Sequence, residues 1–308
     1  MYTALAFDGY HIDQLGARPT PDYTYPGTLV DLAATFEPFI AAVKADRLDK
    51  SVVMNAVNQY GQDGIARAPT SFLYTEVWGP NDTFASLADI IVTNNTLGDG
   101  TKPTVLAAYM NYDLAQGPGF FNTPAVLLTD AVIFAFGGDH IELGEHMLGR
   151  EYFPNENLAI RADLKDALVH YYDFLVAYQN VLRDGGTFNS PGVSSTNGIA
   201  MSAWPSQRGQ VAVVGREVGN RQVIHLLNFL SANSLNWRDN TGTQPVPQRV
   251  GEIRLSYATS RQVKRVWFAS PDVDAGASKD IAFTQTASEV TFTVPSLAYW
   301  DMVVVEYQ

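Results

Sequence analysis

The sequence contains no cysteine, which excludes disulfide bonds, catalysis by a thiol and zinc sites built on cysteine. It also lacks an apolar run long enough to span a membrane as a helix. Its first residues do not have the basic and apolar regions of a secretory signal peptide, so we expect no signal peptide and no membrane span in this chain.

Basic residues are scarce beside acidic ones, with 20 Lys and Arg against 32 Asp and Glu and a net charge of −12. The acidic excess lies before residue 185. Phosphate contacts need Lys and Arg, so this balance predicts no nucleic-acid partner. It is compatible with a neutral substrate such as a sugar, although a solvated acidic surface has the same composition.

The chain up to about residue 184 alternates between strand-like and helix-like patterns. Apolar runs typical of buried strands lie at 4–12, 51–57, 71–77, 103–110 and 139–143. Helical patterns lie between or after them, at 28–46, 82–92, 123–136 and 156–183. Pro38 is expected to kink or restart the first helix. Such alternation favours a parallel sheet with helical crossovers.

After about residue 196 the pattern changes to eight short strand candidates separated by Gly, Asn, Asp and Pro. They lie at 198–204, 210–217, 221–230, 249–256, 263–269, 280–285, 288–294 and 301–307. Val290, Phe292 and Val294 alternate with threonines, as in a strand with one buried face. This part predicts an antiparallel β-sandwich.

Two strand candidates end in a carboxylate that can carry chemistry. Asp13 follows the apolar strand at 4–12, and Glu76 ends the strand at 71–77 between Tyr74 and Trp78. In a β/α barrel the carboxyl ends of the strands face the active site. Glycoside hydrolysis needs such a pair, one carboxylate at the anomeric centre and one that delivers a proton, and nearby aromatic rings can raise the proton donor's pKa by excluding water. Taken singly, either residue is more simply explained as a cap of the next helix.

Five segments together resemble one family. The sequence DGYHIDQLG at residues 8–16 resembles the nucleophile segment of glycoside hydrolase family 66, the family of dextranases and cycloisomaltooligosaccharide glucanotransferases. The sequence LYTEVW at 73–78 is similar to its acid/base segment. Further similar motifs lie at 55–58, 142–147 and 151–155, in the family's order over nearly the whole chain.

The resemblance implies that Asp13 is the nucleophile and Glu76 the acid/base of a retaining double displacement. Asp8 is the rival nucleophile, and we interpret it as a structural residue deeper in the barrel. Residues predicted to bind substrate are His11, Asn55, Asn58, Tyr74, Trp78, Asp113 and Glu142. Turn-capping is nearly as plausible for the two asparagines, and a satisfied core histidine is the more common case for His11.

No metal and no cofactor is predicted. Asp139, His140, Glu142, Glu145 and His146 look like metal ligands, but they form no HExxH pattern and the resemblance implies no catalytic metal.

The predicted fold class is α/β plus all-β. We expect residues 1–190 to form part of a (β/α)8 TIM barrel, about strands 4 to 8, and residues 191–308 to form the β-sandwich domain. Only about five strands precede the long helix, where a full barrel has eight, so the expectation is a truncated chain. Such a half barrel leaves the Asp13 strand with an unpaired edge, and we expect self-association through it.

The predicted function is endo-dextranase activity on α-1,6-glucan (dextran), with an α-glucan polysaccharide or oligosaccharide as the partner. The resemblance implies an extracellular protein. Alternatives are a cycloisomaltooligosaccharide glucanotransferase, a non-catalytic glucan-binding fragment, and another α-glycosidase with a similar barrel. Trp204, Trp237 and Trp267 could bind glucan, but core packing is the better interpretation.

Overall fold

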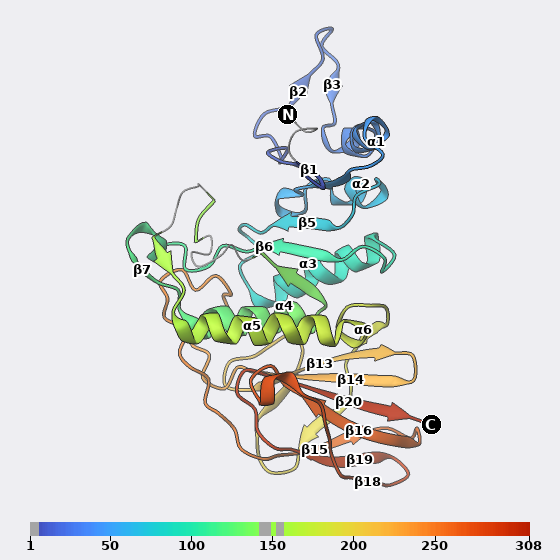
Figure 1. The fold of residues 1–308 in the computed structure, drawn as a ribbon, viewed down its shortest axis with the longest axis vertical. Coiled ribbons are helices and arrows are strands. Elements are labelled where there is room, and N and C mark those ends of the chain that lie inside the picture. Colours follow the sequence, from blue (N-terminus) through green and yellow to red (C-terminus); the bar gives the residue numbers. More distant parts are fainter. Residues whose placement is uncertain (1–5, 142–148, 152–156) are drawn as a thin grey trace. The chain divides into compact units, whose positions relative to one another are not determined.

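The computed structural model describes residues 6–141, 149–151 and 157–308 (Figure 1). The fold is mixed α/β with several sheets. The chain divides into two compact units. The first contains residues 1–81, 89–108 and 138–141, and the second contains 82–88, 109–137 and 142–308. Helix α3 (Phe84–Leu97) begins in the second unit and continues in the first.

The first unit is built on parallel strands. Its elements are β1 (Gly9–Ile12), β2 (Asp22–Tyr23), β3 (Leu29–Val30), the 3-10 turn η1 (Ala33–Thr35), α1 (Phe36–Asp46), β4 (Ser51–Met54), the 3-10 turn η2 (Val57–Gln59), α2 (Gln62–Arg67), β5 (Leu73–Glu76), β6 (Thr104–Ala107) and β8 (Gly138–His140). β1 pairs with β4, and β5, β6 and β8 form a three-stranded sheet. A parallel bridge between Asn55 and Tyr74 connects β4 to β5. The predicted alternation of parallel strands and helices is therefore confirmed over this region.

Close approach of β1 and β4 depends on a glycine. A side chain at Gly9 would collide with the backbone carbonyl of Ser51. The apolar core of this unit includes Phe36 and Ile40 from α1 and Val52 and Met54 from β4. Tyr10 and Ile12 of β1 pack against this core, so it holds both β1 and β4 in place.

The predicted restart of the first helix is also confirmed. The turn η1 gives way to α1 at Phe36, so Pro38 lies in the first helical turn. The amide groups of that turn have no partner within the helix, so proline removes no hydrogen bond there.

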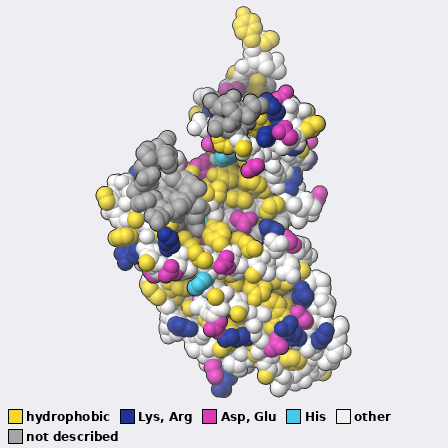
Figure 2. Space-filling model, viewed as in Figure 1, with side chains coloured by type: hydrophobic (Ala, Val, Ile, Leu, Met, Phe, Trp, Pro, Cys, Tyr) yellow, Lys and Arg dark blue, Asp and Glu magenta, His cyan; other side chains and the backbone are white. Residues whose placement is uncertain are grey.

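The short hairpin of β2 and β3 was not predicted. It follows β1, and its turn carries a hydrogen bond from the Gly27 amide to the Thr24 carbonyl. Tyr23, Tyr25 and Leu29 are exposed on it, and hydrophobic side chains are visible at its tip in Figure 2.

The second unit holds two mainly antiparallel sheets, with β12 (Met201–Ala203) parallel to β13 (Val211–Val218) in the larger one. Its helices are α4 (Thr123–Ala135), α5 (Ala162–Ala177) and α6 (Gln179–Leu182), with 3-10 turns η3 (Leu114–Gln116) and η4 (Asp274–Gly276). Strands β7 (Gly119–Phe120) and β9 (Leu158–Ala159) pair in parallel. The remaining strands are β10 (Thr187–Asn189), β11 (Val193–Ser195), β12 (Met201–Ala203), β13 (Val211–Val218), β14 (Arg221–Asn228), β15 (Ile253–Ala258), β16 (Val263–Ala269), β17 (Lys279–Asp280), β18 (Phe283–Gln285), β19 (Glu289–Val294) and β20 (Trp300–Tyr307).

The larger sheet has the order β10-β13-β14-β20-β16-β17, with β12 beside β13, and the smaller has the order β11-β15-β19-β18. One apolar core draws on both sheets. Val290, Phe292 and Val294 of β19 all lie in it, as their alternation predicts, while Thr291 and Thr293 are only partly buried. The opposite face of the larger sheet is covered by α4 and α5, where Tyr171 and Phe174 pack against Trp300.

Two of the three tryptophans considered for glucan binding are core residues. Trp237 and Trp267 are buried. Trp204 is half-buried, and its ring packs against Phe136.

Candidate functional site

The polar residues at the carboxyl ends of β1, β4 and β5 lie on one face of the first unit. Ile12 is paired with Met54, so Asp13 and Asn55 follow the two strands in register. Asn55 bridges Tyr74, and Glu76 lies two residues further along β5 on the same face. Parallel register therefore brings together residues that are 42 and 21 positions apart in the chain.

Asn55 connects the two carboxylates. Its Nδ2 donates to Asp13 Oδ1 at 2.9 Å and to Glu76 Oε2 at 3.2 Å. Its Oδ1 accepts the backbone N–H of Glu76 at 3.2 Å. The side chain is buried, with 3% of its surface exposed, and its backbone N–H donates to the Ile12 carbonyl. The three residues thus form one hydrogen-bonded group.

Tyr74 and His11 lie beside this group. The Tyr74 ring is 4.9 Å from the His11 ring in an edge-to-face contact. Burial, followed by the negative charges of Glu76 and Asp13, raises the pKa of Tyr74 to about 12. The phenol is therefore neutral over the ordinary pH range. His11 is exposed, which differs from the common case of a core histidine.

Asn58 holds the loop that follows Glu76. Its backbone has a positive φ of 51°, and its Nδ2 donates to the Gly79 carbonyl at 3.1 Å. Its Oδ1 accepts the Asn81 side-chain amide at 2.5 Å and the Trp78 backbone N–H at 3.4 Å. Trp78 is half-buried in the loop that these bonds shape.

The structure places the other candidates elsewhere. Asp113 is an exposed residue of the second unit, where its backbone N–H donates to the Asn240 carbonyl at 3.1 Å. Glu142 lies outside the described residues, as do Glu145 and His146. His140 is buried, and its Nε2 lies 3.0 Å from the Ala108 carbonyl oxygen.

Asp8 differs from its predicted position. It was expected deep in the barrel, but it is exposed and precedes the first residue of β1. The reason is that β1 begins only at Gly9, so Asp8 lies on the approach to the strand rather than within it. Its backbone carbonyl accepts the Ser51 N–H at 2.9 Å.

Two further features bear on ligands. In the described ranges, no group of three or more His, Cys, Asp or Glu residues is arranged to hold a metal ion. In the same part of the chain, no helix is long and apolar enough to cross a membrane.

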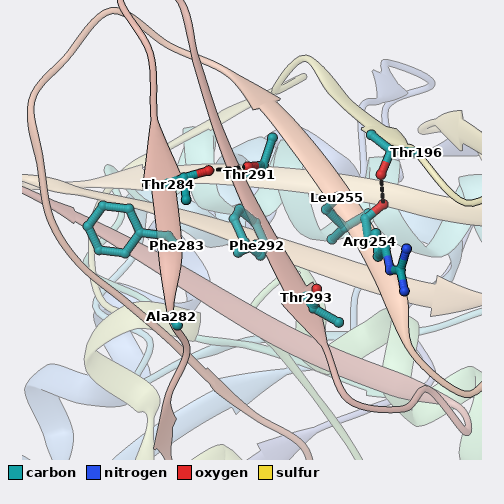
Figure 3. Close-up of a pocket in the computed structure, with 9 residues that line it drawn as sticks. All are labelled: Thr196, Arg254, Leu255, Ala282, Phe283, Thr284, Thr291, Phe292 and Thr293. Carbon is teal, nitrogen blue, oxygen red and sulfur yellow. Dashed lines mark hydrogen bonds between the residues drawn. The ribbon is translucent and has the colours of Figure 1, made fainter.

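Apart from the site around Asn55, a hollow of about 410 Å³ lies on the smaller sheet of the second unit. Thr284, Thr291, Thr293 and Arg254 are among its lining residues, and the Thr284 and Thr291 hydroxyls lie 2.7 Å apart (Figure 3). Hydroxyl and guanidinium groups can hold a polar ligand, but the described lining offers no carboxylate pair for hydrolysis.

The comparison with family models decides the family. The model for glycosyl hydrolase family 66 matches residues 1–304. The chain belongs to this family. The family 66 resemblance of the motifs at 8–16 and 73–78 is thereby confirmed.

Curated relatives of the family 66 chain carry two different activities in their names. A cycloisomaltooligosaccharide glucanotransferase of Niallia circulans is 26% identical over 96% of this chain and 45% of its own length. A dextranase of Streptococcus salivarius is 23% identical over 98% of this chain and 44% of its own length. The chain therefore spans less than half the length of these relatives.

Solved structures support the fold. A cycloisomaltooligosaccharide glucanotransferase of Paenibacillus sp., complexed with cycloisomaltoheptaose, matches with a TM-score of 0.90 and 23% identity, over 98% of this chain and 63% of that one. An α-amylase from Geobacillus thermoleovorans, complexed with acarbose, matches with a TM-score of 0.55 and 11% identity, over 100% of this chain and 62% of that one.

One interaction of the site was not foreseen from the sequence. Asn55 was considered as a sugar ligand or a turn cap, but its amide is bonded to both carboxylates. No local sequence signal indicates it, because the parallel register of β1 and β4, which sets Asn55 beside Asp13, is decided by the tertiary structure.

Proposed function

We propose that this chain carries the catalytic pair of a retaining glycoside hydrolase that acts on α-1,6-glucan, of the endo-dextranase type. Asp13 is the nucleophile and Glu76 is the acid/base in this proposal. The observation that carries it is the contact of one amide nitrogen, Asn55 Nδ2, with both carboxyl groups.

The spacing that follows from this contact suits retention. Because Asn55 Nδ2 lies 2.9 Å from Asp13 Oδ1 and 3.2 Å from Glu76 Oε2, these two oxygens can be no farther apart than the sum of the two distances. Retaining enzymes hold their carboxyl groups about 5–5.5 Å apart, whereas inverting enzymes leave room for a water molecule and hold them about 6.5–9.5 Å apart.

The reaction would proceed in two steps. Asp13 attacks the anomeric carbon, and the glycosidic bond breaks as Glu76 gives its proton to the leaving oxygen. Water then attacks the same carbon, Glu76 takes the proton from that water, and the bond to Asp13 breaks. A sugar hydroxyl in place of water gives transglycosylation.

Neighbouring groups are proposed to bind the glucan. The rings of Tyr74 and Trp78 offer apolar faces for a sugar. His11 is exposed next to Tyr74 and can bond hydroxyls. Asn58 would act by shaping the loop around Trp78, while Asn55, Asp113 and Glu142 keep their predicted substrate-binding roles as proposals.

The assignments of fold, domain bounds, partner and location are also proposals. The parallel strands of the first unit would be about strands 4 to 8 of a (β/α)8 barrel, and the two antiparallel sheets would be a β-sandwich domain. The proposed domains are 1–190 and 191–308, a boundary just after β10. Names of the relatives support an α-1,6-glucan partner. An extracellular site of action, which the family resemblance implies, is proposed with it. We also propose self-association through the edge of β1 that has no partner strand among the described residues.

Dextran hydrolysis by the purified chain tests the proposal. Wild type should release reducing sugar, and Glu76→Gln should lower the rate by about 10²–10⁴-fold, because the variant keeps the shape of the side chain but cannot transfer a proton. Proton NMR of the first product should show the retained α-anomer. Wild-type rates no greater than those of Glu76→Gln would contradict the proposal.

The same purified proteins distinguish two alternative functions. The first alternative is a glucanotransferase that forms cyclic products, which the names of two similar proteins favour. Mass spectrometry distinguishes cyclic from linear isomaltooligosaccharides, because their masses differ by one water molecule. The short span relative to those proteins favours a non-catalytic glucan-binding role as the other. Dextran binding that survives Asp13→Ala, without turnover by wild type, would support that role.

A further inference from the structure

The Asn55 amide can have only one orientation. The Glu76 backbone N–H is a donor, so the atom facing it at 3.2 Å must be the carbonyl oxygen of the Asn55 side chain. The NH2 group therefore faces the two carboxyl groups. This orientation follows from the hydrogen-bond network and not from the choice between two similar atoms.

An NH2 group donates but does not accept, so each oxygen bonded to it must act as an acceptor. When Glu76 carries the acid proton, Oε1 is the favoured position for it, because the carbonyl oxygen of a carboxylic acid is a better acceptor than its hydroxyl oxygen and Oε2 accepts from Asn55. By the same reasoning, the Asp13 oxygen bonded to Asn55 is Oδ1, which leaves Oδ2 for attack on the anomeric carbon.

We infer that Asn55 is a positioning residue that keeps a donor on whichever carboxylate is ionised during the catalytic cycle, an inference that rests on the function proposed above. Before the first step the negative charge is on Asp13 and the proton is on Glu76. When Asp13 forms its bond to the anomeric carbon, its charge is lost and Glu76 becomes ionised. The second step reverses both changes, and the contacts of Asn55 with both groups provide a donor in either state.

Two further side chains lie on the same face as Asn55. The site face also presents His11 from β1 and Tyr74 from β5, which contact each other. Tyr74 stays neutral below a pKa of about 12. Asn55 itself is held by backbone hydrogen bonds on both sides: its N–H donates to Ile12, and the Ala56 N–H donates to Tyr74.

Asn55→Ala tests the inference because it removes the donors without adding charge. Loss of the donor makes the ionised form of each carboxyl group less favourable. Both limbs of the pH–rate profile on dextran should therefore move up, by about one pH unit. The value of kcat should fall about 10²-fold on dextran, but less than about tenfold on an aryl isomaltoside whose leaving group needs no proton. A uniform fall on both substrates with unmoved limbs would indicate a merely structural role and overturn the inference.

Asn55→Asp is the second variant, in case Asn55→Ala does not melt cooperatively. It keeps an oxygen for the Glu76 N–H, removes both donors and adds a charge, so the limbs should move further in the same direction. Asn95→Asp, on α3 of the same unit, makes the same change away from the site and should leave the profile in place. Limbs that move equally in both aspartate variants would overturn the inference.

A direct titration separates this inference from the proposed function. If wild type cleaves neither substrate, the proposed function fails, and carboxyl ¹³C NMR of Asp13 and Glu76 still reports on the contact with Asn55. Both resonances should titrate at higher pH in Asn55→Ala than in wild type. Identical titrations in the two proteins would overturn the inference.

Discussion

Two buried titratable residues on adjacent strands of the larger sheet respond to pH in opposite directions. Burial, then the charge of Arg216, lowers the pKa of His225 on β14 to about 3 from its ordinary value of 6.5. The unfolded chain therefore binds the extra proton, and the stability that depends on neutral His225 is complete above pH 6.5 and is lost as the pH falls toward 3. Burial raises the pKa of Asp301 on β20 well above its ordinary value of 3.8, so its contribution is lost as the pH rises above that value.

Asp301→Asn should stabilise the protein at pH 8. In the described part of the chain neither Asp301 carboxyl oxygen has a hydrogen-bond partner, and the residue is fully buried. A neutral side chain of the same shape avoids a buried charge, so we expect a gain of about 1–3 kcal/mol in the free energy of unfolding. The gain should shrink near pH 4, where wild type also carries the proton.

Urea unfolding at pH 8 and pH 4 measures this difference. Asp89→Asn, at an exposed position on α3, makes the same change in charge and should have little effect at either pH. Equal effects of Asp301→Asn at the two pH values would contradict the assignment of a buried, protonated carboxyl group.

At the scale of elements, the end of α4 shows how closely helix and sheet segments pack in the second unit. Nearly every residue of α4 is buried, as expected for a helix that is apolar on all sides. The helix ends before Gly137, which has a positive φ of 76°. A Cβ at Gly137 would lie 2.6 Å from the Leu182 carbonyl oxygen and 3.0 Å from Arg216 Nη1.

Gly137→Ala should therefore lower the free energy of unfolding by more than backbone strain alone would. Gly185 is the matched control, since it also has a positive φ, of 72°, but nothing lies within 4 Å of the position of its Cβ. We expect Gly185→Ala to cost about 1–2 kcal/mol from the left-handed backbone, and Gly137→Ala to cost about 3 kcal/mol or more because the contacts add to it. Denaturant midpoints measure both variants, and equal losses would contradict the packing argument.

At the scale of the whole molecule, the proposed self-association concerns the edge of β1. Among the described residues β1 pairs with β4 alone. An apolar hollow of about 480 Å³ lies next to it, lined by Tyr10 from β1 and by Phe39 and Val43 from α1 among others. An unpaired strand edge with adjoining apolar surface favours pairing with another copy of the chain.

Phe39→Lys should weaken this self-association. Phe39 is 43% exposed, and a charge in the hollow opposes burial against a second copy. Sedimentation velocity should show wild type associating as its concentration rises, with the variant shifted toward monomer. Leu48→Lys, at a residue that is 78% exposed in the same unit, should behave as wild type. A monodisperse wild-type monomer at all concentrations would contradict the proposal.

Much of the fold could be predicted from local patterns. Strands at 4–12, 51–57, 71–77 and 103–110 correspond to β1, β4, β5 and β6, although each is shorter in the structure. Alternation over Val290–Val294 is sufficient to identify a half-buried strand, because side chains of a strand point to opposite faces. The missed strands include β7, β10, β11 and both strands of the β2–β3 hairpin, and each has only two or three residues, too few for a period to be recognised. The six-residue helix α2 was also missed.

The sequence by itself determined the family, through the motifs around Asp13 and Glu76, and the change from α/β to all-β pattern near residue 190. Tertiary structure alone decided that Asp8 is exposed and that Asn55 joins the two carboxylates. The physical reason is range. Periodicity and turn chemistry act over a few residues, whereas the contacts of Asn55 depend on the register of three parallel strands whose residues lie 21 and 42 positions apart.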